Sequence, residues 1–160
     1  MQHYFIPTRL LDCSENLGIA LFFAISGHME GNNIGLYLLD PIELNKYSSI
    51  GGILIVPEES MRISYMNNYI KKVPYPPNFP IAMRANCTND RIMAQRGMFT
   101  IHGVDLMDLE KLCPKAVKKI IIDNAAVPEI KEFWEIANIN QFNVFPDLHG
   151  LSNHIREMLK

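Results

Sequence analysis

The first twelve residues hold the polar side chains best suited to binding a ligand. His3, Tyr4 and Thr8 lie just ahead of a nearly continuous apolar run. All three can form hydrogen bonds, and the tyrosine ring offers a face on which a planar ligand could stack. A helix that starts soon after this segment would add backbone N–H groups that favour an anion. The spacing therefore predicts a ligand site in the opening segment.

Arg9 and Asp12 belong to the same segment and have an alternative use. They are three residues apart, so they can form an ion pair that holds the opening loop on the following helix. We expect this pairing for the two residues, while His3, Tyr4 and Thr8 have no comparable internal partner. A ligand-binding role for Arg9 stays open at this point.

A second polar cluster occupies residues 90–103, DRIMAQRGMFTIHG. Gln95 falls in the last turn of a short predicted helix, just before a strand, where its amide could face a pocket. Alternatively, Gln95 and Thr100 satisfy backbone groups at this turn. Composition alone does not choose between the two roles.

Several kinds of site are excluded by spacing. Gly51 and Gly52 lack the pattern of a dinucleotide-binding or phosphate-binding loop. The five histidines and three cysteines are dispersed without metal-ligand spacing, so no metal site is predicted. Cys13 has no neighbouring base, and we expect it to be a small buried residue at the start of a helix.

The composition is that of one ordinary globular domain. The chain has 160 residues, 48% of them hydrophobic, and a net charge of −2. Such a charge gives no strong field for nucleic acid or an anionic membrane. The longest apolar run, residues 19–25, is too short to span a bilayer, and we do not expect it to be a signal peptide. With no cysteine pattern typical of disulfides, we expect a cytoplasmic protein.

These residues must be positioned by a set of short alternating elements. Asp12 and Glu15 form a capping-box pattern ahead of a predicted helix at 13–26. The apolar patterns and turn residues predict strands at 34–39, 53–56, 79–83, 98–102 and 117–122, and further helices at 42–46, 59–71, 91–96, 105–112, 128–138 and from 147 onward. The irregular spacing favours an α+β fold over a doubly wound sheet.

The last segments are interpreted as structural. We expect Asp147 to cap the final helix, and Phe145, Leu148, Leu151 and Ile155 to pack that helix on the sheet. Phe133 and Trp134 are expected in the core for the same reason.

Three blocks of the sequence carry a family resemblance. QHYFIPTRLLDCSENLGIALFFA resembles the FRG-domain signature, which commonly reads QHYGLPTRLLDWTxxxxxALFFA. DRIMAQRGMFTIHG is similar to the second block of that family, RIxAQxGxFTIHG, and NVFPDLHGLSNHI to its closing block, (L)FPDLDGLAxxI. The blocks follow in the family's order and imply that residues 1–160 form a single FRG-like domain.

The sequence departs from the family at a few positions. Phe5 replaces the usual glycine, and Cys13 replaces a tryptophan. The Phe-Arg-Gly motif that precedes the opening block in the family is missing, so we expect an N-terminally incomplete domain.

The arrangement also looks distantly like that of ADP-ribosyltransferases. This likeness implies a mixed or antiparallel sheet with several short helices and a core lacking its first strand. It further implies NAD or ADP-ribose binding, with Gln95 and Arg9 as catalytic candidates and His3, Tyr4, Thr8 and Phe99 as cofactor-binding candidates. Tyr4 would stack on nicotinamide. Gln95 cannot act as a general base, because an amide takes up no proton near neutral pH.

Two functions follow from the resemblance. The first is a nucleotide-binding, ADP-ribosyltransferase-like domain with a toxin or defence role. The alternative is a catalytically silent module that binds a protein partner by strand addition at its open sheet edge. Neither involves nucleic acid, a membrane or a metal.

Overall fold

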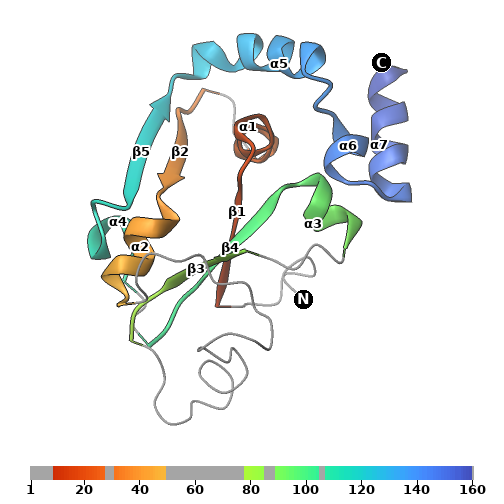
Figure 1. Ribbon diagram of the computed structural model, residues 1–160. Helices are drawn as coiled ribbons and strands as arrows, with labels where there is room; N and C mark the ends of the chain where they lie inside the picture. The colour runs from red at the N-terminus through yellow and green to blue at the C-terminus, as the bar shows by residue number, and fades with distance from the viewer. Residues whose placement is uncertain (1–8, 28–30, 50–77, 85–88, 105–106, 160) are drawn as a thin grey trace. The chain divides into compact units, whose positions relative to one another are not determined.

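A computed structural model describes residues 9–27, 31–49, 78–84, 89–104 and 107–159 (Figure 1). These residues form two small sheets and several short helices, which confirms the predicted α+β class. The chain divides into two compact units. The first unit comprises Met1–Cys13, Leu38–Asn86 and Met98–Lys118, and the second comprises Ser14–Tyr37, Cys87–Gly97 and Lys119–Lys160.

The first unit is built on a three-stranded sheet. The strands are β1 (Leu10–Ser14), β4 (Gly97–Ile101) and β3 (Ile81–Arg84), in the order β1-β4-β3. β3 and β4 are antiparallel, with Ile81 opposite Ile101. Because side chains alternate along a strand, the pair presents two apolar faces.

Each face of that sheet has its own cluster. One face carries Ile81, Met83 and Ile101, with Leu10 and Phe99 packed against them. Ala82 points to the other face, where it meets Leu44, Cys113 and Ala116. Leu44 lies on α2 (Pro41–Tyr47), and α4 (Leu109–Leu112) ends just before Cys113.

In the second unit, two helices pack around aromatic rings. α1 (Leu17–Ser26) lies against α5 (Val127–Ile136). The ring centroids of Phe22 on α1 and Trp134 on α5 are 5.4 Å apart. Together with Ile19 and Val144, Phe22 forms the core of this unit. Both rings therefore serve packing, as predicted for Trp134.

Three further helices complete the second unit: α3 (Asp90–Ala94), α6 (Gln141–Val144) and α7 (Leu148–Met158). α6 contacts both α3 and α7. The guanidinium carbon of Arg91 on α3 lies 4.6 Å from the centre of the Phe145 ring, which ties α3 to the end of α6.

A second sheet contains two strands, β2 (Ile34–Leu39) and β5 (Val117–Ile122). Their bounds agree with the predicted strands at 34–39 and 117–122. A 3₁₀ helix, η3 (Asn124–Ala126), follows β5 and leads into α5. Among the described residues, no helix is both long and apolar enough to cross a bilayer.

The start of the first helix differs from the prediction. Residues 10–14 form strand β1, and α1 begins at Leu17, so the proposed capping box of Asp12 and Glu15 is wrong. Asn16 is the cap instead, because its Oδ1 accepts from the backbone N–H of Ile19. Pairing with β4 overrides the local signal, since a residue inside a sheet cannot cap a helix.

Other boundaries shift by a few residues. Strands predicted at 79–83 and 98–102 are observed at Ile81–Arg84 and Gly97–Ile101. The helix predicted at 105–112 contains only Leu109–Leu112 within the described residues. α6 was not predicted. The strand expected at 53–56 and the helix expected at 59–71 lie outside the described residues.

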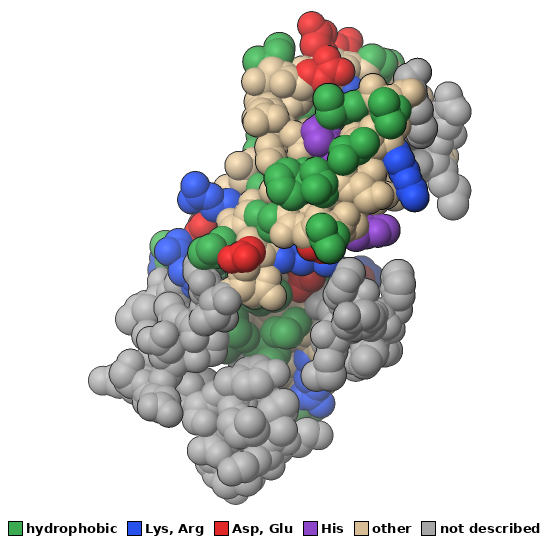
Figure 2. All heavy atoms as spheres, turned by 90° about the vertical axis from the view of Figure 1, so that its right-hand side faces the viewer, with side chains coloured by type: hydrophobic (Ala, Val, Ile, Leu, Met, Phe, Trp, Pro, Cys, Tyr) green, Lys and Arg blue, Asp and Glu red, His purple; other side chains and the backbone are tan. Residues whose placement is uncertain are grey.

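The closing block follows the prediction only in part. Asp147 caps α7, because its Oδ1 accepts from the N–H of Gly150 at 2.8 Å. Phe145 packs against the core of the second unit. The prediction that Leu148, Leu151 and Ile155 pack on the sheet is wrong, since all three are exposed, Leu148 by 85%. Hydrophobic side chains show on the face seen in Figure 2. Phe133, also expected in the core, is exposed as well.

Candidate functional site

The residues of the predicted opening site are only partly described. His3, Tyr4 and Thr8 lie outside the described residues. Arg9 is the first described residue, and it is exposed. Its carbonyl accepts from the N–H of His102 at 3.0 Å, so the backbone of Arg9 is fixed beside the end of β4. Among the described ion pairs none joins Arg9 to Asp12, so the predicted pairing is not observed.

Gln95 is held by backbone groups on both sides. This half-buried residue ends α3, and its Nε2 donates to the carbonyl of Val144 at 3.1 Å. Its own carbonyl accepts from the hydroxyl of Ser14 at 2.8 Å. The structure therefore gives Gln95 the backbone-satisfying role that the sequence left open, by joining α3 to the end of α6. A direct part in catalysis stays a prediction.

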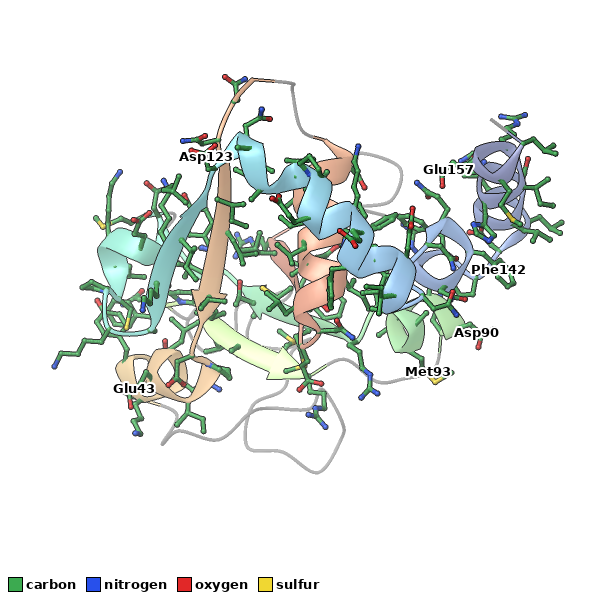
Figure 3. The ribbon with its side chains drawn as sticks, turned by 90° about the horizontal axis from the view of Figure 1, so that it is seen from above. Glu43, Asp90, Met93, Asp123, Phe142 and Glu157 are labelled. Carbon is green, nitrogen blue, oxygen red and sulfur yellow. The ribbon has the colours of Figure 1, made fainter. Side chains whose placement is uncertain are left out.

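The turn around Gln95 is shaped by its neighbour. Arg96 has a φ of 49°, in the left-handed region, which ends α3 and redirects the chain into β4. Figure 3 shows Asp90 and Met93 on α3, close to α6 with Phe142, the two helices that the Gln95 amide joins.

Phe99 and Thr100 point to opposite faces of β4. Phe99 is half-buried and packs against Ile81, Met83 and Ile101. Thr100 is fully buried and lies opposite Ala82. The Thr100 hydroxyl has no hydrogen-bond partner among the described residues, so it does not satisfy the turn as the sequence allowed. Phe99 is thus part of the core of the first unit, and its predicted contact with a cofactor is untested.

The candidate residues divide between the two units. Arg9 and Phe99 belong to the first unit and Gln95 to the second. In the described part of the first unit, Arg9 is not among the residues of the apolar cluster that Phe99 joins.

Cys13 is placed in β1 and not at the start of a helix. Burial, and to a lesser extent the neighbouring Asp12 carboxylate, raise the pKa of the Cys13 thiol. A thiol with a raised pKa is protonated near neutral pH and is a poor nucleophile. This supports the expectation of an inert cysteine.

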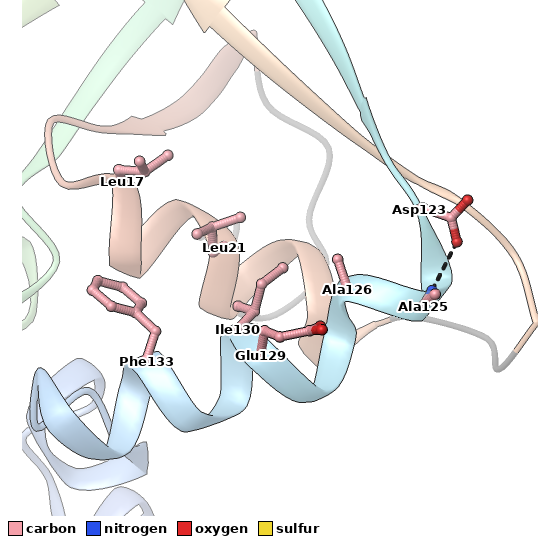
Figure 4. Close-up of a pocket in the computed structure, with 8 residues that line it drawn as sticks. All are labelled: Leu17, Leu21, Asp123, Ala125, Ala126, Glu129, Ile130 and Phe133. Atoms are coloured by element: carbon pink, nitrogen blue, oxygen red, sulfur yellow. Dashed lines mark hydrogen bonds between the residues drawn. The ribbon is translucent and has the colours of Figure 1, made fainter.

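The described residues also form a concavity that the sequence did not reveal. An open groove of about 730 Å³ runs between α1 and α5 in the second unit (Figure 4). Its walls are mostly apolar, and they include the side chains Leu17, Leu21, Ala125, Ala126, Ile130 and Phe133. The charged residues among its lining are Asp123 and Glu129. Leu17 and Leu21 are one helical turn apart, and this spacing could have indicated one wall of the groove. Because α1 is apolar on nearly every side, the spacing does not distinguish these two residues from their neighbours.

The described residues contain no group of three or more His, Cys, Asp or Glu side chains arranged to hold a metal ion. The α1/α5 groove also lacks the cations that usually bind the phosphates of a nucleotide.

Comparison with known proteins gives one match. The family model described as FRG domain matches residues 1–33, which confirms the resemblance of the opening block. No curated protein matches the chain. No solved structure matches it either, so the likeness to ADP-ribosyltransferases remains a prediction.

Proposed function

We propose that this chain is an FRG-like domain that binds a nucleotide, NAD or ADP-ribose, through its opening segment. The observation that carries the proposal is the coincidence of two features in one stretch. The FRG-domain match spans residues 1–33, and this stretch contains His3, Tyr4, Thr8 and Arg9. The proposal therefore rests on the opening segment and not on the α1/α5 groove.

Arg9 suits the charged part of such a ligand. It is exposed, and its backbone is anchored by the hydrogen bond from His102. A guanidinium can bind two phosphate oxygens at once, which makes arginine the usual residue for a diphosphate. Tyr4 would supply the stacking face, and His3 and Thr8 would bind the ribose.

ADP-ribosyl transfer, with a toxin or defence role, is the activity that this binding would serve. Gln95 is poorly suited to act as a base in the transfer reaction, because its amide takes up no proton and its Nε2 already donates a hydrogen bond to the carbonyl of Val144. In this proposal Gln95 keeps the scaffold in place, and Arg9 holds the charge of the ligand.

Thermal unfolding tests the nucleotide proposal. A ligand at about one hundred times its dissociation constant stabilises a protein by roughly 2.7 kcal/mol, which raises Tm by roughly 5 to 10 °C at this size. We expect NAD or ADP-ribose to give such a shift in the full chain. Tyr4→Ala and Arg9→Ala should each reduce the shift, whereas Lys115→Ala, which removes an exposed cation of the first unit, should keep it. Nicotinamide release from NAD then measures transfer or hydrolysis.

A second candidate is the catalytically silent module that binds a strand of a protein partner. Among the described strands the order is β1-β4-β3, and the outer side of β3 is occupied by the Asn45 side chain. An edge strand can accept a strand from another chain. If no nucleotide shifts Tm in the wild-type chain, the nucleotide proposal fails and a strand-binding module is favoured.

A further inference from the structure

The C-terminal helix α7 carries its apolar side chains on the side that faces away from its own unit. Leu148 is 85% exposed, Met158 73% and Leu159, at its end, 82%. Leu151 and Ile155 are exposed too. At 3.6 residues per turn these five residues fall within an arc of about 100° around the helix. We call this arc the α7 stripe.

The opposite side of α7 is fixed against α6. Gly150, which is buried, faces the backbone of this short helix. A Cβ atom at Gly150 would collide with the carbonyl oxygen of Phe145 and would lie too close to that of Gln141. Rotating α7 about its axis therefore cannot bury its apolar side chains against α6, because only the side that carries Gly150 fits there. Among the described residues, nothing covers the α7 stripe.

The α1/α5 groove has the properties that such a helix requires. Leu17, at one end, is 59% exposed, and Phe133 is exposed on the opposite wall. Figure 4 shows the side chains of both helices along the groove, with Glu129 on the same side of α5 as Phe133. The groove is thus an open apolar channel between two helices, with acids among its lining residues.

The charges of the two surfaces are complementary. Arg156 lies beside one edge of the α7 stripe. Arg156 is exposed. The charged side chains that line the groove, Asp123 and Glu129, are both acidic. The edge of the α7 stripe therefore carries a basic residue, and the charged residues of the groove are acidic.

We propose that two copies of this chain pair by placing the α7 stripe of each in the α1/α5 groove of the other. α7 has 11 residues and is about 16 Å long. A standard interface buries roughly 800 Å² on each partner, more than one such helix supplies. Reciprocal exchange puts one helix and one groove of each copy into the interface, which doubles the contact and closes the dimer by two-fold symmetry.

Sedimentation of the full chain over a range of concentrations tests this pairing. The wild-type chain should form a concentration-dependent dimer. Leu148→Glu on the stripe and Leu17→Glu in the groove should each shift it to monomer. Both residues begin a helix, where a carboxylate is favourable, so both variants should keep their helical circular dichroism. Val104→Glu, at an exposed apolar residue of the first unit, should leave the dimer unchanged.

A charge exchange identifies which surfaces meet. Arg156→Glu and Glu129→Arg should each weaken the dimer about fivefold, because each removes two symmetry-related ion pairs worth roughly 0.5 kcal/mol apiece. Combining the two substitutions in one chain should restore the wild-type dissociation constant, because each copy then presents an acidic helix edge to a basic groove rim. If Arg156 and Glu129 do not contact each other across the interface, the double substitution should not restore the dissociation constant.

Three results would overturn the proposal. A wild-type chain that stays monomeric at 150 μM would exclude self-association. A dimer broken by Leu148→Glu but insensitive to Leu17→Glu and Glu129→Arg would mean that α7 pairs with α7. A monomeric wild-type chain that binds vesicles of phosphatidylcholine and phosphatidylserine, and loses this binding in Leu148→Glu, would mean that the stripe covers a membrane surface.

Discussion

Asn45 replaces a strand at the outer edge of β3. This fully buried side chain accepts from the N–H of Ala82 at 2.8 Å and donates to the carbonyl of the same residue at 3.0 Å. One amide thus satisfies both backbone groups that the next strand of a sheet would bind. The contact anchors α2 on the sheet of the first unit.

Removing this amide should be costly. Asn45→Ala would leave a buried N–H and a buried carbonyl of Ala82 without these partners, at roughly 2 to 4 kcal/mol of unfolding free energy. Urea denaturation measures the loss. Asn153→Ala is the matched control, because among the described residues its amide bonds to His149 on the surface. This substitution should change stability by less than about 0.5 kcal/mol. Equal losses in both variants would contradict the role given to Asn45.

Such residues could not be identified from the sequence. Asn45 and Ala82 are 37 positions apart, and the need for an amide arises only when α2 meets the edge of β3. Gln95 is a similar case, since its partner Val144 is 49 positions away. The sequence predicted that Gln95 would face either a pocket or a backbone group, but only the fold selects the backbone group.

At the scale of elements, local signals were more reliable. The Asp147 cap and the β-branched strand at 117–122 were both predicted, because each depends on neighbours within a few residues. The start of α1 was wrong for the opposite reason. There the sheet partner of residues 10–14, more than eighty positions away, decides the local structure.

The Asp147 cap makes α7 sensitive to acid. Hydrogen bonding from the N–H of Gly150 lowers the pKa of the Asp147 carboxyl from its ordinary value of 3.8. Since folding lowers this pKa, the charged cap stabilises α7 fully above the unfolded-state pKa. That contribution decreases as the pH falls through the folded-state value.

Two substitutions separate the charge from the cap. Asp147→Asn keeps an oxygen acceptor for Gly150 but cannot titrate, so it should remove this part of the acid sensitivity while α7 stays folded. Asp147→Ala removes the acceptor and should reduce helical circular dichroism at neutral pH. Urea unfolding between pH 2 and 6 measures the unfolding free energy of the wild-type and Asp147→Asn chains. If this free energy depends on pH in the same way in both chains, the Asp147 carboxyl does not contribute to the acid sensitivity.

At the scale of the whole molecule, the chain divides into two compact units, and the single domain that composition indicates stays a prediction. Each unit is assembled from three separate stretches of sequence. No linker or change of composition marks their boundaries, and four of these fall inside the strands β1, β2, β4 and β5. The fold class could be predicted from the pattern of elements, but the division depends on contacts between distant segments.

The indole of Trp134 gives one of these units an optical label. It is the single tryptophan of the chain and belongs to the second unit. Its Nε1 is buried without a hydrogen-bond partner among the described residues, beside the Phe22 ring. An indole in such dry, apolar surroundings should fluoresce at short wavelength and shift to the red when water reaches it. Tryptophan emission would therefore follow the opening of the second unit alone, while circular dichroism follows both.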